Sequence, residues 1–239
     1  MTPISIATLL RSRLLVSALF LLCVCSACGQ RVNPNAARGV ANALKRIIVS
    51  PQTEEQFVNV FKHAPTQQQL NVLGKVAGKI ETQQTYYMLL NTIGTKTVRE
   101  QLIDQLATSS ENLVSIVGHN EEGVLYFPDK SSATFSELIE AGRDKIIVFI
   151  SCKAAEYINA NAAGPLQEIS LDAGVDIERE FHRLAQQATS ALTLGDTQRI
   201  LADAQDNVAT KRGVKLAAKV SVIAVPGAAG LVRLQSNGR

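Results

Sequence analysis

Two residues with the chemistry of nucleophilic catalysis end two apolar segments of this 239-residue chain. Residues 112–119 read Asn-Leu-Val-Ser-Ile-Val-Gly-His and end at His119, and residues 145–152 read Lys-Ile-Ile-Val-Phe-Ile-Ser-Cys and end at Cys152. If both segments are neighbouring strands of a parallel sheet, their last residues lie along its carboxyl edge, where open α/β sheets bind ligands. A thiol beside an imidazole that can take its proton is what nucleophilic catalysis by cysteine requires. The alternative is that Cys152 is a small buried hydrophobic residue, as many cysteines are.

The start of the chain has the composition of a bacterial export signal. Arg11 and Arg13 precede a largely apolar run without charged residues at 14–24, and the small residues Cys-Ser-Ala-Cys follow at 25–28. A basic segment, a short apolar segment and small residues in this order predict a signal peptide over residues 1–27. The apolar run is short for a bilayer, so a permanent transmembrane helix is the weaker interpretation.

Ser26-Ala-Cys28 also resembles a lipoprotein processing box, although Cys25 stands where leucine is usual. We therefore expect lipidation of Cys28, a lipidated tether over 28–42 and a membrane anchor through the lipid; ordinary signal-peptidase cleavage is the alternative. Gly29, where an aspartate would retain a lipoprotein at the inner membrane, resembles the pattern of outer-membrane lipoproteins. The predicted location is the bacterial cell envelope, facing the periplasm.

The cysteine count adds weight to Cys152. Removal of residues 1–27 takes away Cys23 and Cys25 and leaves Cys28 and Cys152. If Cys28 carries lipid, Cys152 is a leftover thiol in an oxidising compartment, which marks it as a candidate reactive residue. If Cys28 is not lipidated, a Cys28–Cys152 disulfide is the alternative.

Composition excludes some partners. The formal net charge of +3 falls further when Arg11 and Arg13 leave with the signal, so there is no electrostatic case for nucleic acid. No cysteine and histidine spacing fits a zinc site, and we predict neither a metal nor a cofactor. What remains after processing is long enough for one sizeable core, predicted as a single domain over residues 43–239.

The order of elements predicts an α/β fold, with a mostly parallel sheet flanked by helices. Threonines that open capping boxes predict helix starts at Thr53, Thr66 and Thr134, and a further helix is expected over Thr97–Leu106. Further helices are expected at 154–161, 176–192 and 196–208. Strands are expected at 85–90, 112–119, 124–127, 146–150 and 166–171, with a loop at 128–132. Residues 45–50 fit a first strand or the end of a preceding helix, and the apolar segment 214–234 reads as strand plus loop.

The segment between the two reactive residues resembles the caspase-like cysteine peptidases, and their bacterial CHAT branch most closely. The resemblance rests on Ile116-Val-Gly-His119, Gly123-Val-Leu-Tyr-Phe127, Ala133-Thr-Phe-Ser-Glu-Leu138 and Ile146-Ile-Val-Phe-Ile-Ser-Cys152. It implies a caspase-like sheet and hydrolysis of peptide bonds in a polypeptide substrate. It also implies that Cys152 is the nucleophile, that His119 is its base, and that the backbone N–H groups of Asn120 and Cys152 receive the oxyanion.

The chain departs from that family at two positions. Asn120 stands where a glycine usually follows the histidine, although asparagine tolerates positive φ better than most residues. Lys153-Ala-Ala-Glu-Tyr157 follows the cysteine, where the family commonly has a glycine. A non-catalytic lipoprotein that tethers or recognises an envelope protein partner, on a degenerate caspase-like fold, is therefore the competing hypothesis.

Three other positions carry weaker signals. His63 precedes Pro65 at a helix end, where an imidazole commonly caps carbonyl groups, and His182 is expected at the boundary of its helix. Glu121-Glu122 reads as a solvated turn, with the alternative that an acidic pair beside His119 favours a basic substrate residue.

Overall fold

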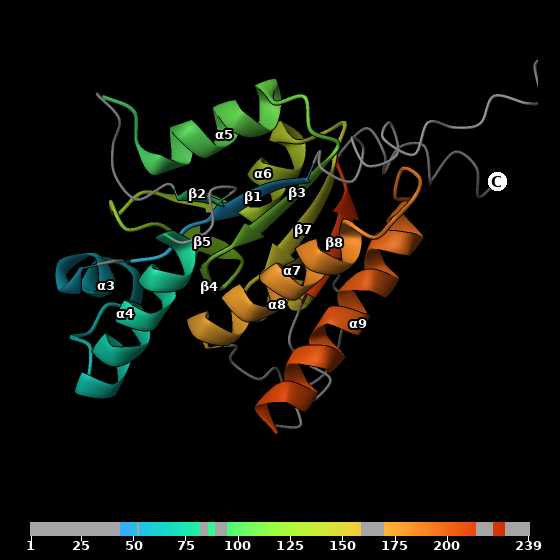
Figure 1. Cartoon of the computed structure of the whole chain (residues 1–239). Coiled ribbons are helices and arrows are strands. Elements are labelled where there is room, and N and C mark those ends of the chain that lie inside the picture. The colour runs from blue at the N-terminus through green and yellow to red at the C-terminus, as the bar shows by residue number, and fades with distance from the viewer. Residues whose placement is uncertain are drawn as a thin grey trace, which may run out of the picture.

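The computed structural model describes residues 44–51, 53–81, 86–88, 95–158, 170–213 and 222–227, and its main feature is a five-stranded sheet (Figure 1). The strand order is β2-β1-β3-β7-β8. The sheet is built from β1 (Leu44–Ile48), β2 (Tyr86–Met88), β3 (Leu113–Val117), β7 (Ile146–Ile150) and β8 (Val222–Pro226). All neighbouring pairs are parallel except β7 with β8. The predicted mixed α/β fold with a mostly parallel sheet is therefore confirmed.

The neighbouring strands β3 and β7 are parallel, and their register determines where the residues that follow each strand lie. Leu113 lies opposite Ile146 and Val117 lies opposite Ile150, and the Gly118 N–H then donates to the Ile150 carbonyl at 3.3 Å. His119 and Cys152 each come two residues after the last registered pair. Both therefore leave the same edge of the sheet at the same level, as the sequence predicts for strands that end side by side.

A second, three-stranded antiparallel sheet of order β4-β5-β6 lies between β3 and β7 in the chain. It consists of β4 (His119–Glu121), β5 (Val124–Tyr126) and β6 (Ser132–Thr134). The predicted hairpin at 120–127 is present, and its first strand begins at His119 itself. The loop expected at 128–132 ends in β6, because Ala133 pairs with Leu125 and is buried.

Helices cover both faces of the main sheet, and Figure 1 shows α8 and α9 side by side along one of them. One core contains sheet residues such as Ile48 and Val148 packed with Phe181 and Ala204. The other contains Ile47 and Phe149 with residues of the opposite helices. The helices are α3 (Glu54–Phe61), α4 (Gln67–Glu81), α5 (Val98–Thr108), α6 (Phe135–Ala141), α7 (Ala154–Ile158), α8 (Leu171–Ala185) and α9 (Leu194–Arg212).

Local capping chemistry fixes most helix starts where they were predicted. The boxes at Thr53, Thr97 and Thr134 are complete, and Thr66 accepts from the Gln69 N–H in the same manner. Leu44–Ile48 form β1, so the first strand is the correct alternative for the segment at 45–50. Residues 1–43 lie outside the described part.

The bounds of two helices, α8 and α9, differ from the prediction, and most of one predicted strand lies outside the described residues. α8 starts at Leu171 rather than at 176 because the Ser170 hydroxyl accepts from the Ala173 N–H, and it ends at Ala185 rather than at 192. Leu171, expected to end a strand, is therefore helical; residues 159–169 lie outside the described residues. α9 starts at Leu194 because Thr193 and Asp196 form a capping box, and it runs to Gly213 in the left-handed conformation.

Candidate functional site

A cleft of ≈ 770 Å³ lies at the edge of the sheet where β3 and β7 end. Its floor is formed by the ends of these strands, and its walls come from α3, α4, the β4–β5 turn, α7 and the start of α8. The residues that line the cleft include Phe57, Phe61, His63, Leu73, His119, Asn120, Glu121, Glu122, Ser151, Cys152, Lys153 and Tyr157. The structure thus brings the predicted His119, Asn120 and Cys152 together in one cleft.

His119 is half-buried and its ring packs on an aromatic wall. The ring centroids of His119 and Phe61 are 4.5 Å apart with an interplanar angle of 45°. Phe61 in turn stacks on Phe57 at 4.4 Å. This contact limits the orientations open to the imidazole, because a ring held against a packed aromatic pair cannot rotate without losing the contact.

Cys152 lies in the turn between β7 and α7 and is half-buried. The next residue, Lys153, has φ of 54°, in the left-handed region that favours glycine. The backbone after the cysteine therefore adopts a glycine-like conformation although the sequence has lysine there. Lys153 directly follows Cys152 in the chain; it is exposed and lines the same cleft.

Asn120 links the two halves of the site through its side chain. It is only 3% exposed, and its Nδ2 donates to the Cys152 carbonyl at 2.5 Å. Its backbone belongs to β4, opposite Leu125, and so is extended. The tolerance of asparagine for positive φ is therefore not used here. What sequence reasoning missed is the side-chain bond, which nothing in the local sequence indicates because the partners are 32 residues apart.

The rim of the cleft carries the acidic turn and two further rings. Glu121 and Glu122 are exposed, as predicted, and Glu122 has φ of 52° in the tight turn with Gly123. The Tyr157 ring lies over Gly123, since a Cβ there would be 3.0 Å from the Tyr157 Cδ1. His63 also lines the cleft, with Nδ1 2.9 Å from the Ala64 carbonyl oxygen, which agrees with a local capping role.

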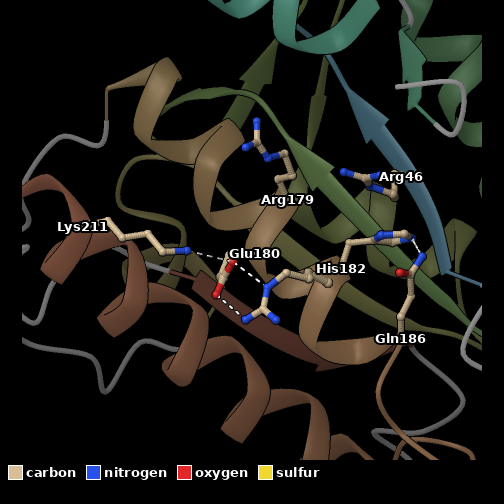
Figure 2. A pocket seen from close by; sticks show the side chains of 7 residues that line it. Arg46, Arg179, Glu180, His182, Gln186 and Lys211 are labelled. Atoms are coloured by element: carbon tan, nitrogen blue, oxygen red, sulfur yellow. Dashed lines mark hydrogen bonds and ion pairs between the residues drawn. The ribbon is translucent and has the colours of Figure 1, made fainter. Parts of the chain in front are cut away.

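A second, smaller cavity of ≈ 470 Å³ lies near the other end of α8 (Figure 2). Behind it, the Arg46 guanidinium makes a two-fold contact with Glu178, at 2.7 and 2.8 Å, and both side chains are almost fully buried. The Ser115 hydroxyl also donates to Glu178 at 3.0 Å. This link between β1, β3 and α8 was not predicted, because its members are far apart in the chain.

His182 lines this cavity from the last turn of α8, so it lies near the end of its helix, as predicted. It is 9% exposed, and burial together with the positive charge of Arg46 lowers the pKa of His182 to about 4. Its Nε2 is 3.4 Å from the Gln186 Nε2, so the neutral ring can accept from that amide (Figure 2). Glu180, beside it, accepts from Arg183 and Lys211, and Arg183 is the main reason that its pKa falls to about 2.

Several predictions about the N-terminus fall on residues that the structure does not describe. The signal peptide, Cys28 and the tether over 28–42 all lie there. In the described part of the chain, no helix combines the length and apolar character needed to cross a membrane. The same residues contain no group of histidine, cysteine or acidic side chains suited to hold a metal ion.

Comparisons of the chain with family models, with curated proteins and with solved structures found no match. The class that can be stated from the molecule itself is a mixed α/β protein with a mostly parallel sheet and a cleft at its carboxyl edge.

Proposed function

We propose that this protein is a caspase-like cysteine peptidase of the CHAT type, held at the bacterial cell envelope by a lipid on Cys28. The observation that supports the catalytic part best is the common position of His119 and Cys152. They follow paired parallel strands at the same register and line the same cleft. Ligand binding and chemistry at the carboxyl edge of a parallel sheet is the general rule for such folds.

The order of elements also supports the caspase-like part of the proposal. The family places a histidine after one central strand, then a small hairpin, a helix and a neighbouring strand that ends in the cysteine. Here β3, the β4–β5 hairpin, α6 and β7 follow in that order, and β3 pairs with β7.

In the proposed reaction, His119 takes the thiol proton and the Cys152 sulfur attacks the carbonyl carbon of a peptide bond. The electron pair of the C=O bond moves to the oxygen, and the backbone N–H groups of Cys152 and Asn120 would receive that oxyanion. The C–N bond then breaks as His119 returns the proton to the amine, which leaves a thioester. Water hydrolyses the thioester, with His119 as base, and restores the thiol.

Iodoacetamide labelling of the folded protein near neutral pH tests the catalytic dyad. A cysteine paired with an imidazole keeps a thiolate fraction and reacts quickly, and His119→Ala should slow the reaction at least tenfold. His63→Ala is the matched control, because that ring lies in the same cleft but caps a carbonyl. Labelling of Cys152 that is slow until denaturant is added would reject the peptidase.

The second proposed function is a non-catalytic envelope lipoprotein that binds a partner protein with this cleft. The observations that favour it are the buried Asn120, where the caspase-like family usually has glycine, and the strained Lys153, in the segment after the cysteine where that family commonly has one. The same labelling experiment separates the two functions, because a binding module needs no reactive thiol. Hydrolysis of basic and acidic reporter peptides by the wild type, but not by Cys152→Ala, would decide for the peptidase.

A further inference from the structure

The cavity of ≈ 470 Å³ near the end of α8 is lined mainly by cationic side chains (Figure 2). The charged residues among its described lining are Arg46, Arg179, Arg183 and Lys211, and the acidic Glu180. A volume of this size is typical of sites for small molecules. The cavity shares no described residue with the cleft at the ends of β3 and β7, so its role is separate from the proposed peptidase chemistry.

Glu180 cannot neutralise all of these cations, because its acceptor positions are already used. Its Oε1 accepts from Arg183 at 2.7 Å and from Asn207 at 3.0 Å. Its Oε2 accepts from Arg183 at 3.0 Å and from Lys211 at 3.4 Å. A carboxylate oxygen has two lone pairs, so both oxygens of Glu180 are fully engaged by these donors.

Donor groups of the wall remain available to a ligand. The Arg179 side chain makes no hydrogen bond or ion pair with the described residues, and Figure 2 draws none for it. Arg183 contacts Glu180 through Nε and Nη2, which leaves its Nη1, and Lys211 directs only one of its three N–H groups to Glu180. All three cationic residues are exposed, so a ligand can reach them.

The wall carries an excess of positive charge. Its three exposed cations face the single carboxylate of Glu180, whereas the buried Arg46–Glu178 pair is balanced. His182 adds no charge near neutral pH, because its pKa is about 4. The C-terminal end of α8 contributes about half a negative charge, so an excess of about one and a half positive charges remains. A dianion can neutralise this excess.

A phosphate monoester is a dianion whose shape fits these donors. At pH 7.5 it carries about two negative charges and has three acceptor oxygens on one atom. Guanidinium groups bind phosphate oxygens in a two-fold geometry, and the lysine ammonium group adds a point charge. We propose that this cavity binds the phosphate group of a phosphate monoester through Arg179, Arg183 and Lys211.

Methyl phosphate and dimethyl phosphate test the charge of the ligand, because the first is a dianion and the second a monoanion. Isothermal titration calorimetry of the full chain at pH 7.5 measures their dissociation constants. We expect methyl phosphate to bind at least about tenfold more tightly than dimethyl phosphate, and more tightly than the dicarboxylate succinate. Equal affinity for the two esters, tighter binding of succinate, or no binding of methyl phosphate at millimolar concentration would overturn the proposal.

Variants of Arg179 test the place of binding. Arg179→Gln removes a donor that makes no contact needed for folding, and it should weaken methyl phosphate binding about tenfold. Arg179→Lys keeps the charge and should recover most of the affinity. Arg199→Gln is the matched control, because it removes an exposed arginine of α9 outside the cavity. Equal weakening by Arg179→Gln and Arg199→Gln would mean that only the overall charge attracts the anion, and would overturn the site.

A vesicle experiment distinguishes a lipid headgroup from a soluble phosphate ester. Phosphatidic acid presents a phosphate monoester, so the full chain is sedimented with phosphatidylcholine vesicles that contain or lack it. Additional binding to phosphatidic acid that Arg179→Gln abolishes identifies the headgroup as the ligand. Binding of methyl phosphate without this additional sedimentation identifies a soluble ester, and both results support the phosphate site. Neither depends on the reactivity of Cys152, so the site and the peptidase can be rejected separately.

Discussion

At the residue scale, the molecule uses histidine in two different ways. His119 is half-buried in a cleft against Phe61, whereas His182 is buried beside Arg46 and Glu178. Only the first position was suggested by the sequence as a place for proton transfer. The second shows that a histidine with a perturbed pKa can belong to the structural framework, because the perturbation there comes from burial and a neighbouring cation.

His182 predicts how stability depends on pH. Its folded pKa of about 4 is below the ordinary value of 6.5, so the unfolded chain binds a proton over this range and the folded chain does not. Above pH 6.5, His182 therefore does not reduce the free energy of unfolding. Between pH 6.5 and 4, its titration lowers the free energy of unfolding by roughly 1 kcal/mol per pH unit. Urea unfolding at pH 7.5, 6, 5 and 4.5 measures it.

His182→Gln is the control for this prediction, because it keeps a polar side chain without a titrating group. The difference between wild type and variant should shrink or change sign as the pH falls, since only the wild type loses stability through this residue. The contribution of Glu180 is lost as the pH falls from the ordinary carboxyl pKa of 4.5 to its folded value of about 2, so it starts to act at the lowest pH of the series, and it does so equally in both proteins. Parallel stability curves for the two proteins down to pH 4.5 would contradict the prediction.

At the element scale, local signals were predictable and distant pairings were not. The capping boxes at Thr53, Thr97 and Thr134 involve residues three apart, so the sequence contains both partners side by side. The start of α8 was missed because 166–171, with apolar Leu166, Ile169 and Leu171, reads as a strand, and because Gly174 lowers helix propensity. The bonds of Asn120 and Arg46 join residues 32 and 132 apart, and only the folded chain brings them together.

The Arg46–Glu178 pair is the main polar link between the sheet and α8. Glu178→Gln leaves a buried guanidinium without its counter-charge, and we expect the free energy of unfolding to fall by about 3–5 kcal/mol. The double variant Arg46→Met with Glu178→Leu should lose much less, because no unpaired charge remains. Urea unfolding at pH 7.5 measures both, with exposed Glu156→Gln as the neutral control. If the single and double variants lost equal free energy of unfolding, the loss would come from altered packing and not from an unpaired charge.

At the scale of the whole molecule, the fold class and the position of His119 and Cys152 in one cleft followed from the alternation of strands and helices. Two apolar segments that end in reactive residues predict a shared site only if the strands are neighbours, and β3 and β7 are. The bond that joins the β4–β5 hairpin to the turn after β7 could not be predicted, because Asn120 and Cys152 are 32 residues apart. The proposed envelope anchor belongs to a different part of the chain and is testable separately.

If residues 1–27 are removed as the proposed signal peptide, the two cysteines that remain should act independently. In cells, we expect a mature N-terminus at diacylated Cys28, and Cys28→Ser should move the protein from the membrane fraction to the soluble fraction. Mass spectrometry of the N-terminus and fractionation measure this. Because a lipidated cysteine cannot form a disulfide, iodoacetamide should label Cys152 at the same rate in the wild type and in Cys28→Ser, without reductant. Faster labelling of Cys152 in Cys28→Ser, together with an unmodified N-terminus in the wild type, would instead establish the Cys28–Cys152 disulfide and remove the anchor.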